Sequence, residues 1–223
     1  MNNSAPIVIT IDGPSGSGKG TLSQMLARHL NYHLLDSGAL YRLVALAAIK
    51  KGVNLDDEQA VSEIAFTLDV MFSLDTKQSA QILLNGEGVT DAIRIESVGM
   101  AASKVAAFPK VRAALLERQR AFAVMPGLVA DGRDMGTTVF PDAQKKLFLT
   151  ASPEARADRR YRQLSAKGES VDLAELVKDI RERDERDSSR AISPLRPADD
   201  AIVIDSTSMS IDQVFTKMLV AIS

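Results

Sequence analysis

The chain has 223 residues, of which 45% are hydrophobic and 25% charged, and its formal net charge is −2. This composition is that of an ordinary soluble protein, long enough for one sizeable α/β domain with an insertion. The small net charge gives no indication of a general nucleic-acid or membrane surface, and no apolar run reaches membrane-spanning length. Cysteine is absent, which excludes disulfides, thiolate metal sites and cysteine nucleophiles. We expect a cytoplasmic enzyme, since the polar start of the chain lacks the basic and apolar regions of a secretory signal.

A predicted strand at 7–11 leads into a glycine-rich loop and then into a helix that extends to about residue 30. Glycine allows the loop backbone to turn its N–H groups toward an anion, and the start of the helix adds unpaired N–H groups. Lys19 supplies a full charge for the β- and γ-phosphates, and this order of strand, loop, lysine and helix is that of a phosphate-binding loop. The residues expected to hold the phosphates are Gly13, Pro14, Ser15, Gly16, Ser17, Gly18, Lys19, Gly20 and Thr21. The general pattern has Ser or Thr directly after the lysine, where this chain has Gly20, so direct binding of Mg²⁺ by Thr21 is left open.

The next segments alternate between strand and helix. A short strand at 32–36 ends in Asp36-Ser37-Gly38, a helix follows at 39–50, and Asp56 is expected to cap another that reaches about residue 67. Residues 68–95 then alternate in polarity around an Asn85-Gly86 turn, which predicts a small antiparallel β insertion. The remaining predicted strands cover 128–131, 146–150 and 201–205. The remaining predicted helices cover 95–106, 109–124, 172–187 and 211–222, and one more begins at Ser152-Pro153. Alternating strands and helices predict a parallel sheet with helices on both faces.

Three segments place arginine beside carboxylates or hydroxyls near the ends of these elements, where ligands collect in open α/β folds. They cover residues 36–42, 131–137 and 181–190. Arginine binds phosphate bidentately and stays charged. Arg133 and Asp134 directly follow a predicted buried strand, which favours a functional role over a simple turn. For 181–190, a solvated helix face with paired charges is an equally good interpretation.

Four further arginines crowd one predicted helix before Gly168: Arg156, Arg159, Arg160 and Arg162. One or two of them are expected to close over nucleotide phosphates as a lid at about 156–168, and the others to lie along the surface. Arg159 is the candidate for contact with ATP. The histidines, His29 and His33, are expected to be structural or exposed.

Taken together, these motifs resemble those of the bacterial cytidylate kinases, which are nucleoside monophosphate kinases with a phosphate-binding loop. The resemblance rests on the stretches 13–21, 36–42, 132–141 and 183–190, in that order, and covers essentially the whole chain. The last two stretches are the more specific, because many unrelated enzymes share the loop. The Lys-Gly-Thr ending of the loop is also usual in monophosphate kinases. The resemblance implies a single kinase domain over 1–223, in which the insertion at 68–95 is the monophosphate-binding region.

The resemblance also implies roles for individual side chains. The transferring group would be surrounded by Lys19, Arg42, Arg133, Arg183 and Arg190. CMP would be bound by Ser37, Arg42, Ser103, Arg112, Arg133, Asp134, Arg183, Asp187 and Arg190, among which Ser103, Arg112 and Asp134 would read the cytosine and Asp187 would contact the ribose. Mg²⁺ would arrive with ATP and be held mainly by phosphates and water, with Asp36 and Asp131 as candidate partners of those waters and no protein ligand assigned. The family implies a monomer that acts on CMP or dCMP, without nucleic-acid or membrane partners.

Identification of the base depends on few residues. Asp134 would accept a hydrogen bond from the amino group of cytosine but would face O4 of uracil, a mismatch that costs about 1–3 kcal/mol when buried. A preference for CMP over UMP follows. The alternatives are another small kinase of this fold, acting on UMP, AMP or shikimate, and a nucleotide-dependent switch or binding module without catalysis. A guanine-reading switch would need an Asn-Lys-x-Asp motif, which the chain lacks, and would have no use for a second anion site.

Overall fold

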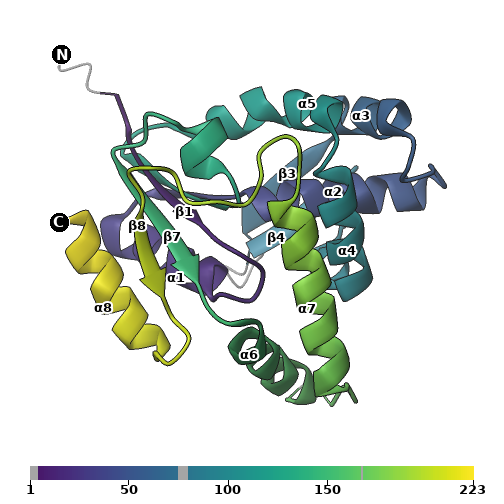
Figure 1. Cartoon of the computed structure of the whole chain (residues 1–223). Helices are drawn as coiled ribbons and strands as arrows, with labels where there is room; N and C mark the ends of the chain where they lie inside the picture. Colours follow the sequence, from purple (N-terminus) through teal and green to yellow (C-terminus); the bar gives the residue numbers. More distant parts are fainter. Residues whose placement is uncertain (1–4, 75–79, 167) are drawn as a thin grey trace. The chain divides into compact units, whose positions relative to one another are not determined.

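The computed structural model describes residues 5–74, 80–166 and 168–223 (Figure 1). The chain divides into two compact units. One comprises Met1–Asp36 and Gln119–Ser223 and is called the sheet unit; the other comprises Ser37–Arg118 and is called the helical unit. The chain therefore passes between the units at two points only. Parts of the predicted insertion (75–79) and of the predicted lid (167) lie outside the described residues.

The sheet unit contains a five-stranded parallel sheet with the strand order β2-β6-β1-β7-β8. Its strands are β1 (Ile7–Asp12), β2 (His33–Asp36), β6 (Gly127–Gly132), β7 (Lys145–Thr150) and β8 (Ile202–Asp205). β1 and β6 read as nearly continuous apolar runs because both of their faces are buried. In the register of the sheet, Asp36 pairs with Asp131 and Asp12 with Gly132. The carboxyl ends of these three strands thus meet at one edge, where open α/β folds bind ligands.

Helices pack against both faces of this sheet, as the alternating pattern predicts. On one face, α1 (Lys19–Leu30) and α8 (Ile211–Ile222) share a core with the strands that includes Leu22, Leu26, Leu149 and Val214. On the other, the short π-helix η2 (Met135–Val139) lies so close that a Cβ atom on Gly136 would be 2.9 Å from Oγ1 of Thr10.

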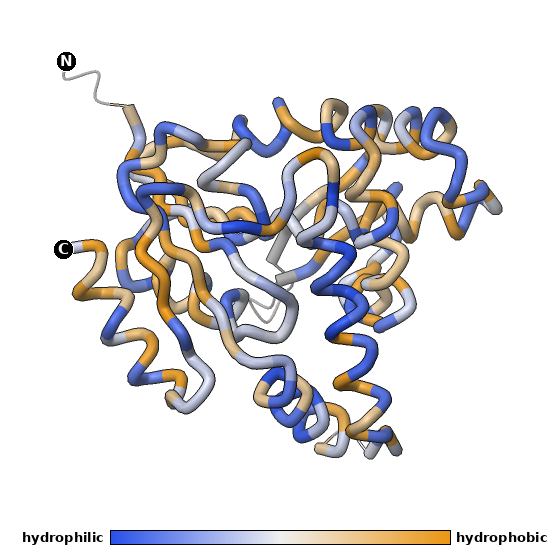
Figure 2. Tube along the Cα trace, in the orientation of Figure 1, coloured by the Kyte–Doolittle hydropathy of each residue, from blue (hydrophilic) through white to orange (hydrophobic). Residues whose placement is uncertain are grey.

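Two further helices of the sheet unit are α6 (Pro153–Ser165) and α7 (Leu173–Ser188). α6 begins as predicted, with Ser152 accepting a hydrogen bond from the Ala155 N–H and proline at its first position. Asp172 caps α7 by accepting from the N–H groups of Ala174 and Glu175. Figure 2 shows α7 as mostly hydrophilic, and its buried residues, Arg183 and Asp187, are charged.

The helical unit contains the predicted insertion as a three-stranded antiparallel sheet in the order β3-β4-β5. Asn85 and Gly86 both have positive φ angles and form the turn after β4, as their sequence predicts. The elements of this unit are α2 (Ser37–Lys50), α3 (Glu58–Phe66), β3 (Val70–Leu74), β4 (Ala80–Leu84), β5 (Glu87–Gly88), the 3₁₀ helix η1 (Ala92–Arg94), α4 (Glu96–Val105) and α5 (Pro109–Arg120), of which α5 ends in the sheet unit.

Two sequence predictions in this region are wrong in detail. Asp57, not Asp56, caps α3, since its carboxylate accepts a hydrogen bond of 3.1 Å from the Ala60 N–H. The helix predicted to reach residue 124 ends at Arg120. Its last turn is closed by tighter bonds from the N–H groups of Phe122 and Ala123 to carbonyls three residues earlier, at Gln119 and Arg120.

Candidate active site

The phosphate loop, residues 13–21, connects β1 to α1. Gly16 and Gly18 have φ angles of 76° and 91°, a conformation that L-residues rarely adopt. Gly18 is the N-cap residue of α1 and has no side chain to cap it. Gly13 leaves the end of β1 so close to β7 that a Cβ atom there would lie 2.0 Å from the carbonyl oxygen of Leu149. The loop therefore presents the positive N-terminus of α1 to a ligand without an obstructing side chain.

Lys19 is held inside this loop. Its Nζ donates a 3.2 Å hydrogen bond to the Pro14 carbonyl and lies 4.0 Å from Oδ1 of Asp131. Burial lowers the pKa of Lys19 to about 8; the positive charge of Arg133 adds to the shift, and Asp131 opposes it. Burial raises the pKa of Asp131, against the attraction of Lys19. A buried ammonium that shares its surroundings with another cation favours an incoming anion such as a polyphosphate.

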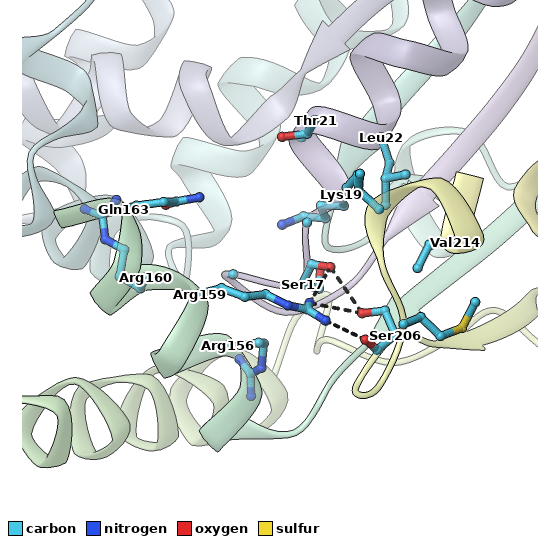
Figure 3. Close-up of a pocket in the computed structure, with 15 residues that line it drawn as sticks. Ser17, Lys19, Thr21, Leu22, Arg156, Arg159, Arg160, Gln163, Ser206 and Val214 are labelled. Atoms are coloured by element: carbon cyan, nitrogen blue, oxygen red, sulfur yellow. Dashed lines mark hydrogen bonds between the residues drawn. The ribbon is translucent and has the colours of Figure 1, made fainter. Parts of the chain in front are cut away.

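A cavity of about 440 Å³ opens beside the loop, and its size suits a nucleotide (Figure 3). Arg159 reaches across one side and donates to the carbonyl of Ser17 at 3.4 Å and to Oγ of Ser206 at 3.2 Å. The wall is completed by side chains of α6 and of the segment from β8 into α8. All of the lining residues belong to the sheet unit: Gly16, Ser17, Gly18, Lys19, Gly20, Thr21, Leu22, Arg156, Arg159, Arg160, Gln163, Ser206, Met209, Ile211 and Val214.

The four arginines of α6 thus have different surroundings: three line the cavity and one is exposed. Arg156, Arg159 and Arg160 line the cavity, as the lid prediction requires for at least one of them. Arg162 instead forms an exposed ion pair of 2.7 Å with Asp158 on the same helix. Arg156 is buried and bonded to the loop itself, through the carbonyl of Ser15 at 2.9 Å.

Asp12, which the sequence did not single out, joins the start of the phosphate loop to η2. Its carboxylate accepts hydrogen bonds of 2.8 Å from the N–H groups of both Met135 and Gly136. Burial raises the pKa of Asp12 to about 7, although these two hydrogen bonds lower it. The sequence signal that could have identified Asp12 is its position at the end of β1, at the same sheet edge as Asp131. Asp12 fixes the backbone directly after Arg133 and Asp134.

The structure brings together three of the predicted residues as a buried cluster of Arg133, Asp187 and Arg190. Nε of Arg133 lies 3.1 Å from Oδ2 of Asp187, and Arg190 pairs with Oδ1 of the same carboxylate. Arg183 is also buried on α7, one helical turn before Asp187. The interpretation of 181–190 as only a solvated face is therefore wrong for these residues, although Arg181 does form an exposed ion pair with Glu154.

The other predicted residues lie in the helical unit. Ser37 is the buried first residue of α2, and Ser103 is buried in α4. Nη1 of Arg42 donates to the carbonyls of Ile93 and Ile95, at 2.7 and 3.3 Å. The guanidinium of Arg112 lies 5.6 Å from the ring centre of Tyr41, and its Nη1 donates to the Ala106 carbonyl at 3.1 Å. That these residues bind CMP stays a prediction.

Comparison with known proteins decides the family. The family model for cytidylate kinase matches residues 9–223. The chain belongs to the cytidylate kinase family. The family predicted from the motifs is thereby confirmed, and with it a kinase of the phosphate-binding-loop type.

Individual relatives match over nearly their whole length. The cytidylate kinase of Pseudomonas aeruginosa (strain LESB58) is 61% identical over 220 residues, which cover 98% of this chain and 96% of that protein. The cytidylate kinase of Aeromonas salmonicida is 59% identical over 219 residues, covering 98% and 94%. That of Colwellia psychrerythraea is 57% identical over 219 residues, covering 98% and 96%.

Within residues 5–74, 80–166 and 168–223, no group of three or more His, Asp or Glu side chains is arranged to hold a metal ion. No helix in the described part of the chain has the length and apolar character needed to span a membrane.

Proposed function

We propose that the protein catalyses transfer of the terminal phosphoryl group of ATP to CMP, and to dCMP. The observation that carries this proposal is the match of residues 9–223 to the cytidylate kinase family, supported by relatives of that name at about 60% identity. The geometry agrees with it, since the phosphate loop and its cavity suit the donor nucleotide. The buried cluster of Arg133, Asp187 and Arg190 suits an acceptor phosphate.

The reaction needs no general base, because the attacking oxygen belongs to a phosphate that is already anionic near neutral pH. Catalysis would then consist of positioning and of charge stabilisation on the transferring group. In this proposal Lys19 and the N-terminus of α1 hold the donor phosphates, and Arg133, which directly follows β6, neutralises charge on the acceptor side. Arg42, Arg183 and Arg190 complete this set in the proposal.

Mg²⁺ fits the oxygen-rich edge of the sheet. Asp36 and Asp131 end neighbouring strands in register, and carboxylate oxygens are the ligands that this ion prefers. A Cβ atom on Gly20 would lie 3.5 Å from Oδ2 of Asp131, so the small residue leaves that carboxylate open toward the loop. We propose that ATP phosphates and water hold the ion, and that Asp36 and Asp131 bind its waters. The ion would supply charge neutralisation between the β- and γ-phosphates.

Recognition of the base and sugar is assigned to individual side chains. Asp134, which is buried at the end of β6, would accept from the amino group of cytosine, while Ser103 and Arg112 would donate to its ring acceptors. Ser37 would assist at the phosphate and Asp187 at the ribose. The segments 68–95 and 156–168 would close over CMP and ATP, and Arg159 would contact ATP from α6. We propose that the protein works as a monomer, which light scattering can test.

A coupled assay with ATP and each of CMP, dCMP, UMP and AMP tests the proposal. Turnover of CMP with a kcat/KM about ten- to a hundredfold above that of UMP is expected, because uracil places an acceptor opposite Asp134. Equal turnover of CMP and UMP would contradict the assignment of the base-reading residues. Binding of ATP without transfer to any monophosphate would instead favour a nucleotide-binding module.

A further inference from the structure

Arg156 stands out because it is the largest fully buried side chain among those that the structure describes, with 2% of its surface exposed. It projects from the first turns of α6, the same helix that carries Arg159 (Figure 3). Its Nε donates to the carbonyl of Ala151 at 2.9 Å, and its Nη1 donates to the carbonyl of Ser15 at 2.9 Å. Ser15 belongs to the phosphate loop, so Arg156 binds the backbone of the donor site rather than facing the solvent.

The other side of the same guanidinium binds α7. Nη1 lies 2.9 Å from Oδ1 of Asp184, and Nη2 pairs with Oδ2, so that both carboxylate oxygens are engaged. Asp184 sits between Arg183 and Asp187, within one helical turn of each. Fixing Asp184 therefore fixes the part of α7 that contributes to the buried cluster with Arg133.

One rigid, planar group thus connects two parts of the proposed site. The five N–H donors of arginine have a fixed geometry, so Ser15 and Asp184 are held at a set separation, which a flexible lysine could not do. Gly16 packs closely on the same side chain, since a Cβ atom there would be 3.2 Å from Cβ of Arg156. Movement of Arg156 onto a nucleotide phosphate would break these bonds and leave the half-buried carbonyl of Ser15 without this donor.

We propose that Arg156 and Asp184 are positioning residues, which set the distance between the donor phosphates on the phosphate loop and the acceptor-binding residues of α7. Arg156 then contacts neither nucleotide, in contrast to the lid role that the sequence allows for it. This inference rests on the proposed phosphoryl transfer, because it assigns the two residues to alignment of the same donor and acceptor.

The test compares Arg156→Lys, Asp184→Asn and the double variant by steady-state kinetics with ATP and CMP, by calorimetric ATP affinity and by thermal unfolding. We expect kcat/KM for CMP to fall at least about tenfold in each single variant, with the Kd of ATP within about twofold of wild type. The double variant should be no slower than the slower single variant, because both changes break one connection. Asp184 is less buried than Arg156, so its variant keeps the test valid if Arg156→Lys fails to fold.

The chain offers a matched control in Glu154→Gln. Glu154 and Arg181 join the same two helices by an ion pair of 2.5 Å that is exposed and does not touch the loop. This variant should change kcat/KM less than about twofold, as exposed pairs contribute little. Equal losses in the control and in Asp184→Asn would overturn the proposal in favour of a merely structural role.

Two other results would also overturn it. Weaker ATP binding in proportion to the loss of rate would mean that Arg156 contacts the donor directly, and additive losses in the double variant would mean that the two residues act separately. A failure of the proposed function is distinguishable, because it would show in the wild-type protein as absence of transfer to CMP.

Discussion

Replacement of Gly13 by alanine should destabilise the protein strongly, because the first residue of the phosphate loop has no space for a Cβ atom. The added atom would lie 2.0 Å from the carbonyl oxygen of Leu149. Ordinary C···O contacts are no shorter than about 3.3 Å. Removing this clash requires β7 to shift by about 1.3 Å, although β7 is hydrogen-bonded to β1 on one side and to β8 on the other and is buried at Leu149. Overpacking of this kind costs about 1–3 kcal/mol, and the φ angle of 152° adds about 1–3 kcal/mol for a residue with a side chain. The sum is about 4 kcal/mol, a large part of the stability of a typical domain.

Urea unfolding monitored by circular dichroism measures this loss, and Gly52→Ala is the matched control. Gly52 also has a positive φ angle, 66°, but a Cβ atom there would meet nothing within 4 Å. The control should therefore lose only about 1–2 kcal/mol, the conformational cost alone. The reasoning would be refuted if Gly13→Ala were no less stable than Gly52→Ala, since the contact with β7 would then cost nothing.

Three further predictions concern the residues around the phosphates. Lys19→Met and Arg133→Ala should each lower kcat by about 10³–10⁵ while thermal unfolding still shows a cooperative fold, and a near-normal rate in either variant would argue against its role. Because burial lowers the pKa of Lys19 to about 8, its side chain is charged at pH 7 and neutral at about pH 9.5. The affinity of the free protein for ATP should therefore fall between these two pH values. Above pH 8, binding of ATP should be accompanied by uptake of protons. Calorimetry in two buffers of different ionisation enthalpy measures the uptake, and an affinity equal at both pH values would contradict it. Gly20→Ala should change stability by less than about 1 kcal/mol, because its Cβ atom would make only an ordinary contact of 3.5 Å with Asp131. A loss as large as that of Gly13→Ala would contradict this expectation.

Much of the sheet unit could be predicted from local patterns. β1 and β6 are apolar runs that end at glycine-containing loops, and the loop before Lys19 needs glycine for reasons visible in the sequence alone. The π-helix η2 could not be predicted, because Met135 and Gly136 are held there by a carboxylate more than 100 residues earlier, that of Asp12. Its start depends on a tertiary contact and not on a local cap.

The arginines of α6 show the same limit at the level of the site. The spacing of Arg156, Arg159 and Arg160 places all three on one helix, but it cannot tell which of them is buried. The partners that decide this, Ser15 and Asp184, are 141 and 28 residues away from Arg156 in the sequence. On α7, the same pattern of alternating charges yields an exposed Arg181 and a buried Asp187. The helices themselves could therefore be predicted from the sequence, whereas the burial of each charged side chain on them depends on the packing.

The division of the chain after Asp36 and after Arg118 has a consequence for the evolution of the family. Two recombination events, one between β2 and α2 and the other within α5, would replace the helical unit as a single genetic cassette. Such an exchange would transfer Ser37, Arg42, Ser103 and Arg112 together, and it would leave the phosphate loop and the residues of α7 unchanged. On the proposed assignment of these residues to CMP, donor binding and part of acceptor choice would be inherited separately, and chimeras of related sequences joined at these two points should alter acceptor preference.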